Sequence, residues 1–346
     1  MEAIIKSNVN RQFRLKSRPV GRIKVSDFDY VEEPIPVPAD GEALVRNLYL
    51  SLDPANRIWM SDMDQYMPPV EIGAVMRGVG IGQVIASKSS RFKVGELVTG
   101  FINWQDFSVA RPDDDRPLSV MPKDLPVPLP TMLAACGVTG LTAYFGLLDL
   151  GKPQPGDTVV VSAAAGAVGS VVGQIAKIKG CHTVGIAGGP LKCRLIKEEF
   201  GFDAAVDYKA QDWREQLEMA TPNGVDVNFE NVGGEIMEAV MARMNLYGRM
   251  PLCGLISDYN NAEAAKADFS PILMRRIGIQ GFIITDFAGR YAEGATQLAQ
   301  WIAEGRIRSR ETIVEGLDKA PTAINMLFDG TNTGKLIVKM ADPIAV

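Results

Sequence analysis

The sequence predicts an α/β protein in which a β-rich N-terminal part precedes a doubly wound parallel sheet. Three observations predict this fold. Short β-branched segments alternate with helical ones from residue 158 onward, a glycine-spaced turn follows the first of these strands, and the first 130 residues show strand and turn signals without helical periodicity. With 346 residues, of which 47% are hydrophobic and 22% charged, the chain can bury a large core, and its length favours two domains.

The N-terminal part is expected to contain short strands separated by Gly, Pro and Asp. The clearest β-rich segments are 42–51, 78–86 and 96–102. A proline-rich segment, 125–130, then gives way to an Ala/Leu-rich helical stretch over 131–150 that is broken around 136–140. We place the domain boundary near residue 129.

After this boundary, strands and helices alternate. The expected strands are 158–162, 183–186, 204–207, 225–230, 248–252 and 279–284. One helix is expected to follow the first strand and end at 179, and four more are expected over 192–199, 212–220, 235–244 and 291–304. Such alternation implies right-handed βαβ units and a six-stranded parallel sheet. The tail from residue 313, with an expected strand over 335–340, is not needed to complete this fold. We expect domains over 1–128, completed by 313–346, and over 129–312, with the active site in the cleft between them.

The glycine-spaced turn is the most informative motif. Ala163, Gly166 and Gly169 follow a β-branched run, and the residues from Gln174 onward continue as a helix. This strand–turn–helix context is that of a dinucleotide fingerprint, in which backbone N–H groups and a helix N-terminus meet a pyrophosphate. The uncharged run 158–176 is also long enough to be considered as a membrane-spanning segment. A strand within it would, however, leave its backbone polar groups without hydrogen bonds in lipid. A buried strand and helix without a nucleotide is the other alternative.

The charges after the second expected strand favour NADPH over NADH. An enzyme that prefers NADH usually has Asp or Glu at the end of this strand to bind the ribose 2′-hydroxyl. Residues 185–192 contain no carboxylate, and Lys192 and Arg194 are the nearest charges. A 2′-phosphate would therefore meet cations. The alternative is that Lys192 is an ordinary solvated lysine at a helix start.

Composition argues against several other function classes. The net charge of −5 and the pI near 5.2 do not favour a nucleic-acid or anionic-membrane partner. No apolar segment follows the basic residues near the N-terminus, so no signal peptide is expected. The four cysteines show no close pair and no metal-like spacing, which favours a reduced cytoplasmic compartment, and the single histidine, His182, provides no Ser-His or Cys-His machinery. No metal site is expected.

Together, the motifs resemble those of the zinc-free medium-chain dehydrogenases/reductases of the leukotriene B4 12-hydroxydehydrogenase/prostaglandin reductase group, and most closely the bacterial NADPH-dependent curcumin reductases. The resemblance covers nearly the whole chain. The matching pieces are 51–54 with Arg57, 100–106, 140–144, 163–169 with 173–177, 230–234, 253–257 with 259–260, 281–284, and Asn332 with 334–335. One departure is that family members commonly carry Tyr-Met after Asp53-Pro54, whereas this chain has Ala55-Asn56.

The resemblance implies a GroES-like domain joined to a Rossmann domain, a homodimer, and NADPH contacts at named positions. Gly166, Ala167, Val168 and Gly169 would hold the pyrophosphate, Lys192 and Tyr208 would hold the 2′-phosphate, and Gly188 would be a further cofactor contact. The remaining contacts would come from Asn231, Cys253, Gly254, Leu255, Ile256, Ser257, Tyr259, Phe282, Ile283, Ile284, Asn332 and Gly334.

The chemistry expected of such a site is hydride delivery to an activated carbon–carbon double bond. The chain lacks the Cys, His and carboxylate ligand set of zinc alcohol dehydrogenases, which disfavours carbonyl–alcohol chemistry. Hydride from NADPH would add to the β-carbon of an α,β-unsaturated ketone or aldehyde, and the enolate oxygen would need a hydrogen-bond donor. Tyr259 is the first candidate, and Tyr66, which matches a tyrosine of the curcumin reductases at the cleft mouth, is the second. Met60, Met63, Met67 and Trp104 are candidates for the apolar lining.

Two alternatives remain open at this point. An NADPH quinone reductase would use the same cofactor and a zinc-free cleft. A non-catalytic NADPH-binding protein, like the crystallin relatives of this superfamily, would bind the cofactor without hydride transfer. The expected partner is a small-molecule substrate, without nucleic acid or membrane.

Overall fold

The computed structural model describes residues 9–260 and 268–345, and the chain divides into two compact units. The first unit consists of Met1–Pro130, Thr312–Thr331 and Leu336–Val346, and the second of Thr131–Glu311 and Asn332–Lys335. Each unit has its own sheets and its own hydrophobic clusters.

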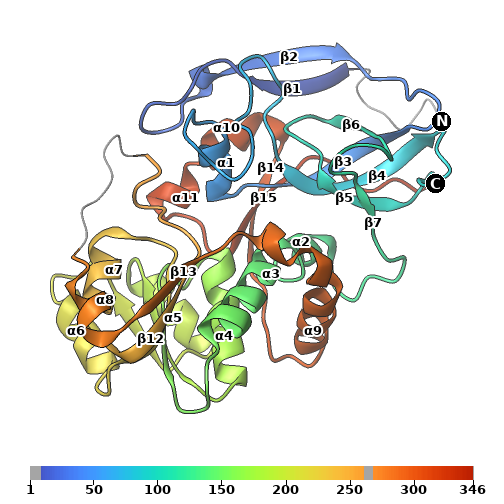
Figure 1. The fold of residues 1–346 in the computed structure, drawn as a ribbon. Coiled ribbons are helices and arrows are strands. Elements are labelled where there is room, and N and C mark those ends of the chain that lie inside the picture. Colours follow the sequence, from blue (N-terminus) through green and yellow to red (C-terminus); the bar gives the residue numbers. More distant parts are fainter. Residues whose placement is uncertain (1–8, 261–267, 346) are drawn as a thin grey trace. The chain divides into compact units, whose positions relative to one another are not determined.

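The second unit contains the predicted doubly wound sheet of six parallel strands (Figure 1). Their spatial order is β10 (Ala204–Asp207), β9 (His182–Ala187), β8 (Thr158–Val161), β11 (Val225–Phe229), β12 (Met244–Leu252) and β13 (Gly278–Gly281). All the pairings are parallel. The chain starts in the middle of the sheet and winds outward in both directions, as in dinucleotide-binding folds, and this confirms the predicted fold class.

Strand β8 explains why helices cover both faces of this sheet. Val159 and Val161 are fully buried in a cluster with residues of α3 (Val138–Phe145), α4 (Ala167–Ile178) and α9 (Tyr291–Ala303). Val160, between them, is buried in a second cluster with residues of α6 (Trp213–Ala220) and α7 (Gly234–Met241). Successive side chains of a strand point to opposite faces, so an unbroken apolar run suits a strand that is covered on both sides.

The helical stretch expected over 131–150 is broken, as predicted. It consists of α2 (Leu129–Leu133), α3 and a π-helical segment, Gly146–Gly151. A Cβ atom on Gly146 would lie 2.4 Å from Cζ of Phe282, so only glycine fits where this segment begins. The remaining helices of the unit are α5 (Pro190–Glu198) and α8 (Ser270–Arg275).

Three predicted boundaries in this unit are wrong by three residues or more. The strand expected over 248–252 already begins at Met244. The strand expected to reach Ile284 ends at Gly281, and Ile284–Arg290 form a 3-10 helix. The Asp286 carboxylate accepts a hydrogen bond from the backbone N–H of Ile283, which favours a helix start there. The helix expected to reach residue 244 ends at Met241, because Met244 already pairs with β11 in the sheet.

The first unit contains the expected β-rich structure. Its larger sheet has the order β14 (Glu311–Glu315), β15 (Lys335–Lys339), β3 (Ala43–Ser51), β4 (Val79–Ser87), β5 (Leu97–Phe101) and β7 (Ser119–Val120), and β6 (Phe107–Ala110) also pairs with β3. The predicted strands 42–51, 78–86 and 96–102 correspond to β3, β4 and β5. Three short helices, α1 (Pro54–Trp59), α10 (Ala320–Ala323) and α11 (Met326–Asp329), complete it.

A two-stranded antiparallel sheet of this unit, β1 (Val9–Leu15) and β2 (Phe28–Pro34), was not predicted. Half of its residues carry charged or amide side chains, which obscures the strand signal. Phe13 and Phe28 nevertheless pack into the core of the unit, where Phe28 stacks on Trp104 at 5.4 Å between ring centroids.

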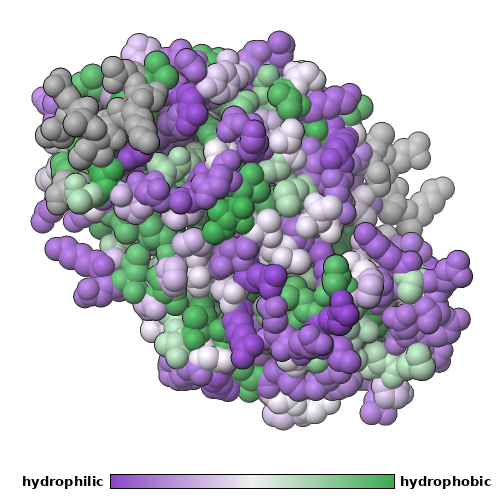
Figure 2. Space-filling view, turned by 180° about the vertical axis from the view of Figure 1, so that it is seen from behind, coloured by the Kyte–Doolittle hydropathy of each residue, from purple (hydrophilic) through white to green (hydrophobic). Residues whose placement is uncertain are grey.

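Hydrophilic side chains cover much of the face that Figure 2 views, with hydrophobic ones scattered among them. Such a mixture is ordinary for a globular protein. In the described ranges, 9–260 and 268–345, no helix is long and apolar enough to cross a bilayer.

Candidate cofactor site and active site

The turn between β8 and α4 presents backbone N–H groups at a helix start. Helix α4 begins at Ala167 after the N-cap residue Gly166. A Cβ atom on Gly169 would lie 2.4 Å from the carbonyl oxygen of Ala163, which itself has a positive φ of 50°. Position 169 therefore accepts only glycine, and an anion can approach the first turn of α4 closely. All four predicted pyrophosphate residues, which include Val168, lie in this turn.

Asn332 and Gly334 lie against the same turn. The backbone N–H of Gly334 donates a hydrogen bond to the carbonyl oxygen of Ala165 at 2.8 Å, and Gly334 forms a parallel bridge with Gly166. The buried side-chain amide of Asn332 donates to the carbonyl oxygen of Gly334 at 3.1 Å. The structure thus brings these two residues to the glycine turn from a distant part of the sequence.

The side chain of Tyr208 packs against Gly188, in the loop between β9 and α5. A Cβ atom on Gly188 would lie 2.9 Å from Cε1 and 3.0 Å from the hydroxyl oxygen of Tyr208. One oxygen of Asp207, Oδ1, accepts hydrogen bonds from the backbone N–H groups of Gly189 at 2.7 Å and Lys209 at 3.0 Å. This carboxylate therefore ties the loop after β9 to the loop after β10.

Two lysines lie close to each other near this loop. Lys192, in the first turn of α5, is half-buried, and burial lowers the pKa of its ammonium group, which the like charge of Lys209 lowers further. The ammonium group of Lys209 lies 6.0 Å from the ring centroid of Tyr208. A bound phosphate would relieve the repulsion between the two cations. Sequence reasoning named Lys192 and Tyr208 but missed Lys209, although a cation directly after the tyrosine was an available signal.

Glu230 is a fully buried carboxyl group at the end of β11. Its Oε1 accepts hydrogen bonds from the hydroxyl of Ser162 at 2.7 Å and from the backbone N–H groups of Val232 at 2.7 Å and Gly233 at 3.0 Å. Its Oε2 accepts one from the side-chain amide of Asn228 at 3.1 Å. Burial raises the pKa of Glu230, and these hydrogen bonds oppose the rise. Sequence reasoning placed Glu230 in a family motif but gave it no role.

Asn231 is fixed by Ser162. The backbone N–H of Asn231 donates to the Ser162 hydroxyl oxygen at 2.8 Å, and its side-chain amide donates to the Ser162 carbonyl oxygen at 2.8 Å. The loop that follows β12 is attached to the same residues. The carbonyl oxygen of Glu230 accepts a hydrogen bond from the backbone N–H of Cys253 at 2.9 Å, and that of Asn231 accepts one from the backbone N–H of Ile256 at 3.2 Å. The predicted residues Asn231 and 253–259 are therefore brought together.

Tyr259 lies in this loop and is partly buried. Its hydroxyl oxygen accepts a hydrogen bond from the backbone N–H of Leu255 at 3.2 Å. Within residues 9–260 and 268–345, the structure shows no acceptor for the proton of this hydroxyl. Burial raises the pKa of Tyr259, so the group keeps its proton at neutral pH. The arrangement leaves a phenol that can donate a hydrogen bond.

In the segment after β13, the side chain of the predicted cofactor residue Phe282 packs into the hydrophobic core. The ring of Phe282 is 9% exposed and packs edge to face against Phe229, with 6.3 Å between centroids. Ile283 and Ile284 lead into the 3-10 helix. The Phe282 side chain therefore belongs to the hydrophobic core, which leaves only its backbone for a ligand contact.

Tyr66 lies in the first unit and is 41% exposed. Its hydroxyl oxygen accepts a hydrogen bond from Nε1 of Trp59 at 2.8 Å. Of the four apolar residues named as candidates for the lining, Met60, Met67 and Trp104 are buried in the core of the unit, and Met63 is 56% exposed.

His182 and the cysteines form no metal-like group. Nε2 of His182 lies 3.1 Å from the carbonyl oxygen of Ala220, and Nδ1 lies 3.7 Å from the carboxylate of Asp203. In the part of the chain that the structure describes, no three His, Cys, Asp or Glu side chains are placed to hold a metal ion.

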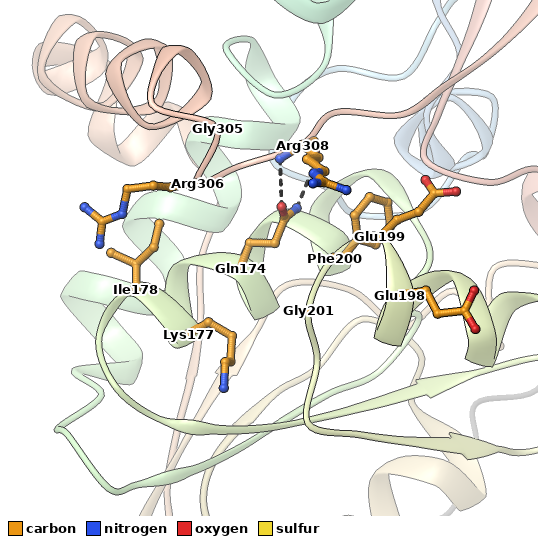
Figure 3. Close-up of a pocket in the computed structure, with 10 residues that line it drawn as sticks. All are labelled: Gln174, Lys177, Ile178, Glu198, Glu199, Phe200, Gly201, Gly305, Arg306 and Arg308. Carbon is orange, nitrogen blue, oxygen red and sulfur yellow. Dashed lines mark hydrogen bonds between the residues drawn. The ribbon is translucent and has the colours of Figure 1, made fainter.

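A surface hollow of about 440 Å³ lies elsewhere on the second unit (Figure 3). Gln174 and Lys177 of α4 line it with Glu199 and Arg308. Gln174 donates to the carbonyl oxygen of Arg308 at 3.1 Å and accepts from its backbone N–H at 2.7 Å. None of the predicted cofactor residues lines this hollow. It is not the candidate active site.

Two family models match the chain. Residues 11–118 match the model described as the N-terminal domain of oxidoreductase, and residues 167–303 match the model described as zinc-binding dehydrogenase.

Named proteins resemble the chain over almost its full length. It is 42% identical over 340 residues to the NADPH-dependent curcumin reductase of Escherichia coli (strain K12), which covers 96% of this chain and 97% of that protein. It is 37% identical over 338 residues to the NADP(+)-dependent 2-alkenal reductase of Nicotiana tabacum, over 96% and 98%. The solved structure of CurA from Vibrio vulnificus in complex with NADPH matches with a TM-score of 0.91 and 45% identity, over 96% of this chain and 100% of that one.

Proposed function

Because the chain belongs to the zinc-free medium-chain dehydrogenase/reductase family and is an NADPH-dependent oxidoreductase, we propose that it reduces the carbon–carbon double bond of α,β-unsaturated ketones and aldehydes. The observation that carries this proposal is the phenol of Tyr259, which is held by Leu255 and keeps a proton to donate. The named activities of the curcumin and 2-alkenal reductases support it.

The residues of the second unit fit NADPH. A glycine turn with exposed backbone N–H groups precedes α4. Lys192 and Lys209 lie close enough to repel each other, and neither forms an ion pair with a described residue. We propose that the cofactor contacts are Gly166, Ala167, Val168, Gly169, Gly188, Lys192, Tyr208, Lys209, Asn231, Cys253, Gly254, Leu255, Ile256, Ser257, Tyr259, Phe282, Ile283, Ile284, Asn332 and Gly334. When bound, NADPH supplies the hydride that the reaction adds to the β-carbon of the substrate.

Tyr259 would act on the oxygen of the substrate. Addition of hydride to the β-carbon leaves negative charge on the carbonyl oxygen as an enolate, and a fixed donor stabilises that charge more than it stabilises the neutral carbonyl. The Leu255 N–H withdraws electron density from the phenol oxygen, which strengthens its remaining O–H as a donor. Tyr66 of the first unit is the second candidate for this role.

An acceptor screen that follows NADPH absorbance tests the reaction class. We expect turnover of enones and enals and little turnover of saturated aldehydes, with the double bond reduced in the product. If only quinones are turned over, the protein is a quinone reductase. Tight NADPH binding without turnover of any acceptor would assign a non-catalytic cofactor-binding protein.

We also propose that the second unit binds NADPH, that the first unit is a GroES-like domain that binds the substrate, and that the enzyme is a cytoplasmic homodimer. The dimer is supported by the free edge of the sheet. Strand β13 is the last strand and is exposed along its length, and Tyr247, Leu273 and Met274 nearby are 68%, 71% and 65% exposed. No strand among the described residues pairs with the outer edge of β13, and an unpaired strand edge favours pairing with a second copy. Sedimentation of the wild type and of Leu273→Asp tests this: we expect a dimer that the substitution weakens.

A further inference from the structure

Two arginines of the first unit converge on one sulfur atom. Nη1 of Arg77 lies 3.2 Å from Sδ of Met67, and Nη1 of Arg116 lies 3.7 Å from the same atom. Nη1 of Arg77 also donates to the carbonyl oxygen of Pro68 at 2.9 Å. A thioether is a weak acceptor without charge, so Met67 neutralises neither guanidinium group.

Each guanidinium group lies over an aromatic ring. Cζ of Arg77 is 5.7 Å from the ring centroid of Trp59, and Cζ of Arg116 is 5.7 Å from that of Phe101. The two rings contact each other edge to face, with 6.0 Å between centroids. Stacking on a ring holds the plane of a guanidinium group and leaves its edge N–H groups available to a planar anion.

Neither arginine has a carboxylate partner within the described residues. Arg11 and Arg22 of the same unit, by contrast, form ion pairs with Asp106 and Asp329. Arg77 is half-buried, and its pKa is lowered first by burial and then by repulsion from Arg116, while Tyr66 acts weakly in the opposite direction. Two neighbouring guanidinium groups that form no ion pair with a described carboxylate favour the binding of an anion.

The position of Arg77 depends on a residue in which this sequence departs from its family. Asn56, which is 1% exposed, donates from its side-chain amide to the carbonyl oxygen of Arg77 at 3.1 Å and accepts from the backbone N–H of Asp53 at 2.7 Å. A methionine at position 56 could make neither hydrogen bond. The departure at Ala55-Asn56 and the placement of Arg77 are therefore one structural feature.

We propose that Arg77 and Arg116 bind a carboxylate group of the substrate, so that the preferred enones and enals of this enzyme are organic acids. The inference rests on the proposed function and adds the substrate class to it. The two oxygens of a carboxylate match the edge N–H groups of arginine, and Trp59 and Phe101 offer apolar surface beside them. Tyr66, the second candidate for the active site, bonds to Trp59 and so belongs to the same cluster.

Matched acids and esters test the proposal. The substrates are para-carboxybenzylideneacetone and an aliphatic 2-alkenal that ends in a carboxylate, each compared with its methyl ester. We expect the wild type to reduce at least one acid with a kcat/KM about tenfold or more above that of its ester, mainly through KM. Added salt should reduce this ratio, because it screens the partly exposed charges.

Variants then assign the preference to the two arginines. Arg77→Gln and Arg116→Gln should each lower the acid-to-ester ratio about fivefold to tenfold. Arg91→Gln is the matched control, since Arg91 of the same unit also lies over a ring, that of Phe92 at 5.4 Å, but outside this cluster. Its ratio should equal that of the wild type. Arg116 is exposed, so its substitution does not endanger folding.

The outcomes separate this inference from the proposed function. If acids and esters are reduced equally well, the reductase assignment holds and the carboxylate site is wrong. If the acid preference survives in the double variant Arg77→Gln/Arg116→Gln, the site is also wrong. If neither the acids nor the esters are reduced, both proposals fail.

Discussion

Ser162 and Glu230 join the carboxyl ends of two neighbouring strands: the hydroxyl of Ser162, after β8, donates a hydrogen bond to Oε1 of Glu230, after β11, at 2.7 Å. The carbonyl oxygen of Glu230 also accepts from Cys253, after β12. One buried residue thus connects three loops, two of which carry the candidate residues Asn231 and Tyr259. The order of these loops depends on a carboxyl group that touches no ligand in the proposed reaction.

We expect the Glu230→Gln variant to become more stable relative to the wild type as pH rises. Burial raises the pKa of Glu230 in the folded protein above its value in the unfolded chain. The stabilising contribution of the Glu230 side chain is therefore complete at pH values below its pKa in the unfolded chain. It is lost as pH rises through its higher pKa in the folded protein. Glutamine does not ionise and lacks this loss.

Urea unfolding between about pH 5 and pH 9 measures the effect. The difference in unfolding free energy between variant and wild type should shift towards the variant by up to about 1.4 kcal/mol for each pH unit crossed between the two pKa values. A difference that stays constant with pH would contradict the raised pKa.

Removing the charge of Lys192 or Lys209 should weaken NADPH binding selectively. A charge-assisted hydrogen bond to phosphate contributes roughly 1–3 kcal/mol, so Lys192→Gln and Lys209→Gln should each raise the Kd for NADPH by about tenfold or more and leave that for NADH nearly unchanged. Lys197→Gln, on the exposed side of α5, is the control. Equal binding of NADH and NADPH by the wild type would refute the charge-based preference.

Tyr259→Phe should lower kcat about 10-fold to 10³-fold on a good enone, because it removes a donor that acts mainly in the transition state while it keeps the ring. The Leu255 N–H loses its acceptor in this variant, so the Kd for NADPH should be measured alongside and is expected to change little. Tyr30→Phe, on the exposed surface, serves as control. Full turnover by Tyr259→Phe would move the donor role to Tyr66.

The four thiols should be unreactive in the native protein. Burial raises the pKa of Cys136, Cys181 and Cys193 to about 11, and burial together with Glu230 raises that of Cys253 to about 12. Only the thiolate reacts, so at about pH 8 exchange with a disulfide reagent should be roughly 100-fold slower than in the unfolded chain. Titration with a chromogenic disulfide, with and without guanidinium, compares the two states. A native thiol that reacts at the unfolded rate would contradict this prediction.

The sequence was sufficient for the second unit because its signals are local. The apolar run of β8 and the glycines that follow it specify strand, turn and helix within 20 residues or so, and β10 begins and ends where the pattern predicts. The ends of β13 and α7 were missed because competing contacts, a capping Asp286 and the pairing of Met244 with β11, determine them.

The site was less accessible to sequence reasoning wherever a role depends on a distant partner. The glycines at 166 and 169 can be identified from their spacing alone. Lys209 gains its meaning only from its proximity to Lys192, and Glu230 only from the hydroxyl of Ser162 that reaches it. The sequence shows that Lys209 follows Tyr208, but it does not show that Lys209 lies near Lys192 or that Ser162 reaches Glu230.

The cover that Tyr208 forms over Gly188 has a consequence for how cofactor preference can evolve. The carboxylate that selects NADH is usually carried at the end of the second strand, but any side chain at 188 would start within 3.0 Å of the tyrosine ring. Gly188→Asp alone would therefore displace Tyr208 and harm binding of both cofactors. The exchange becomes accessible only after Tyr208 has been replaced by a small residue, so the two substitutions are epistatic and their order is fixed.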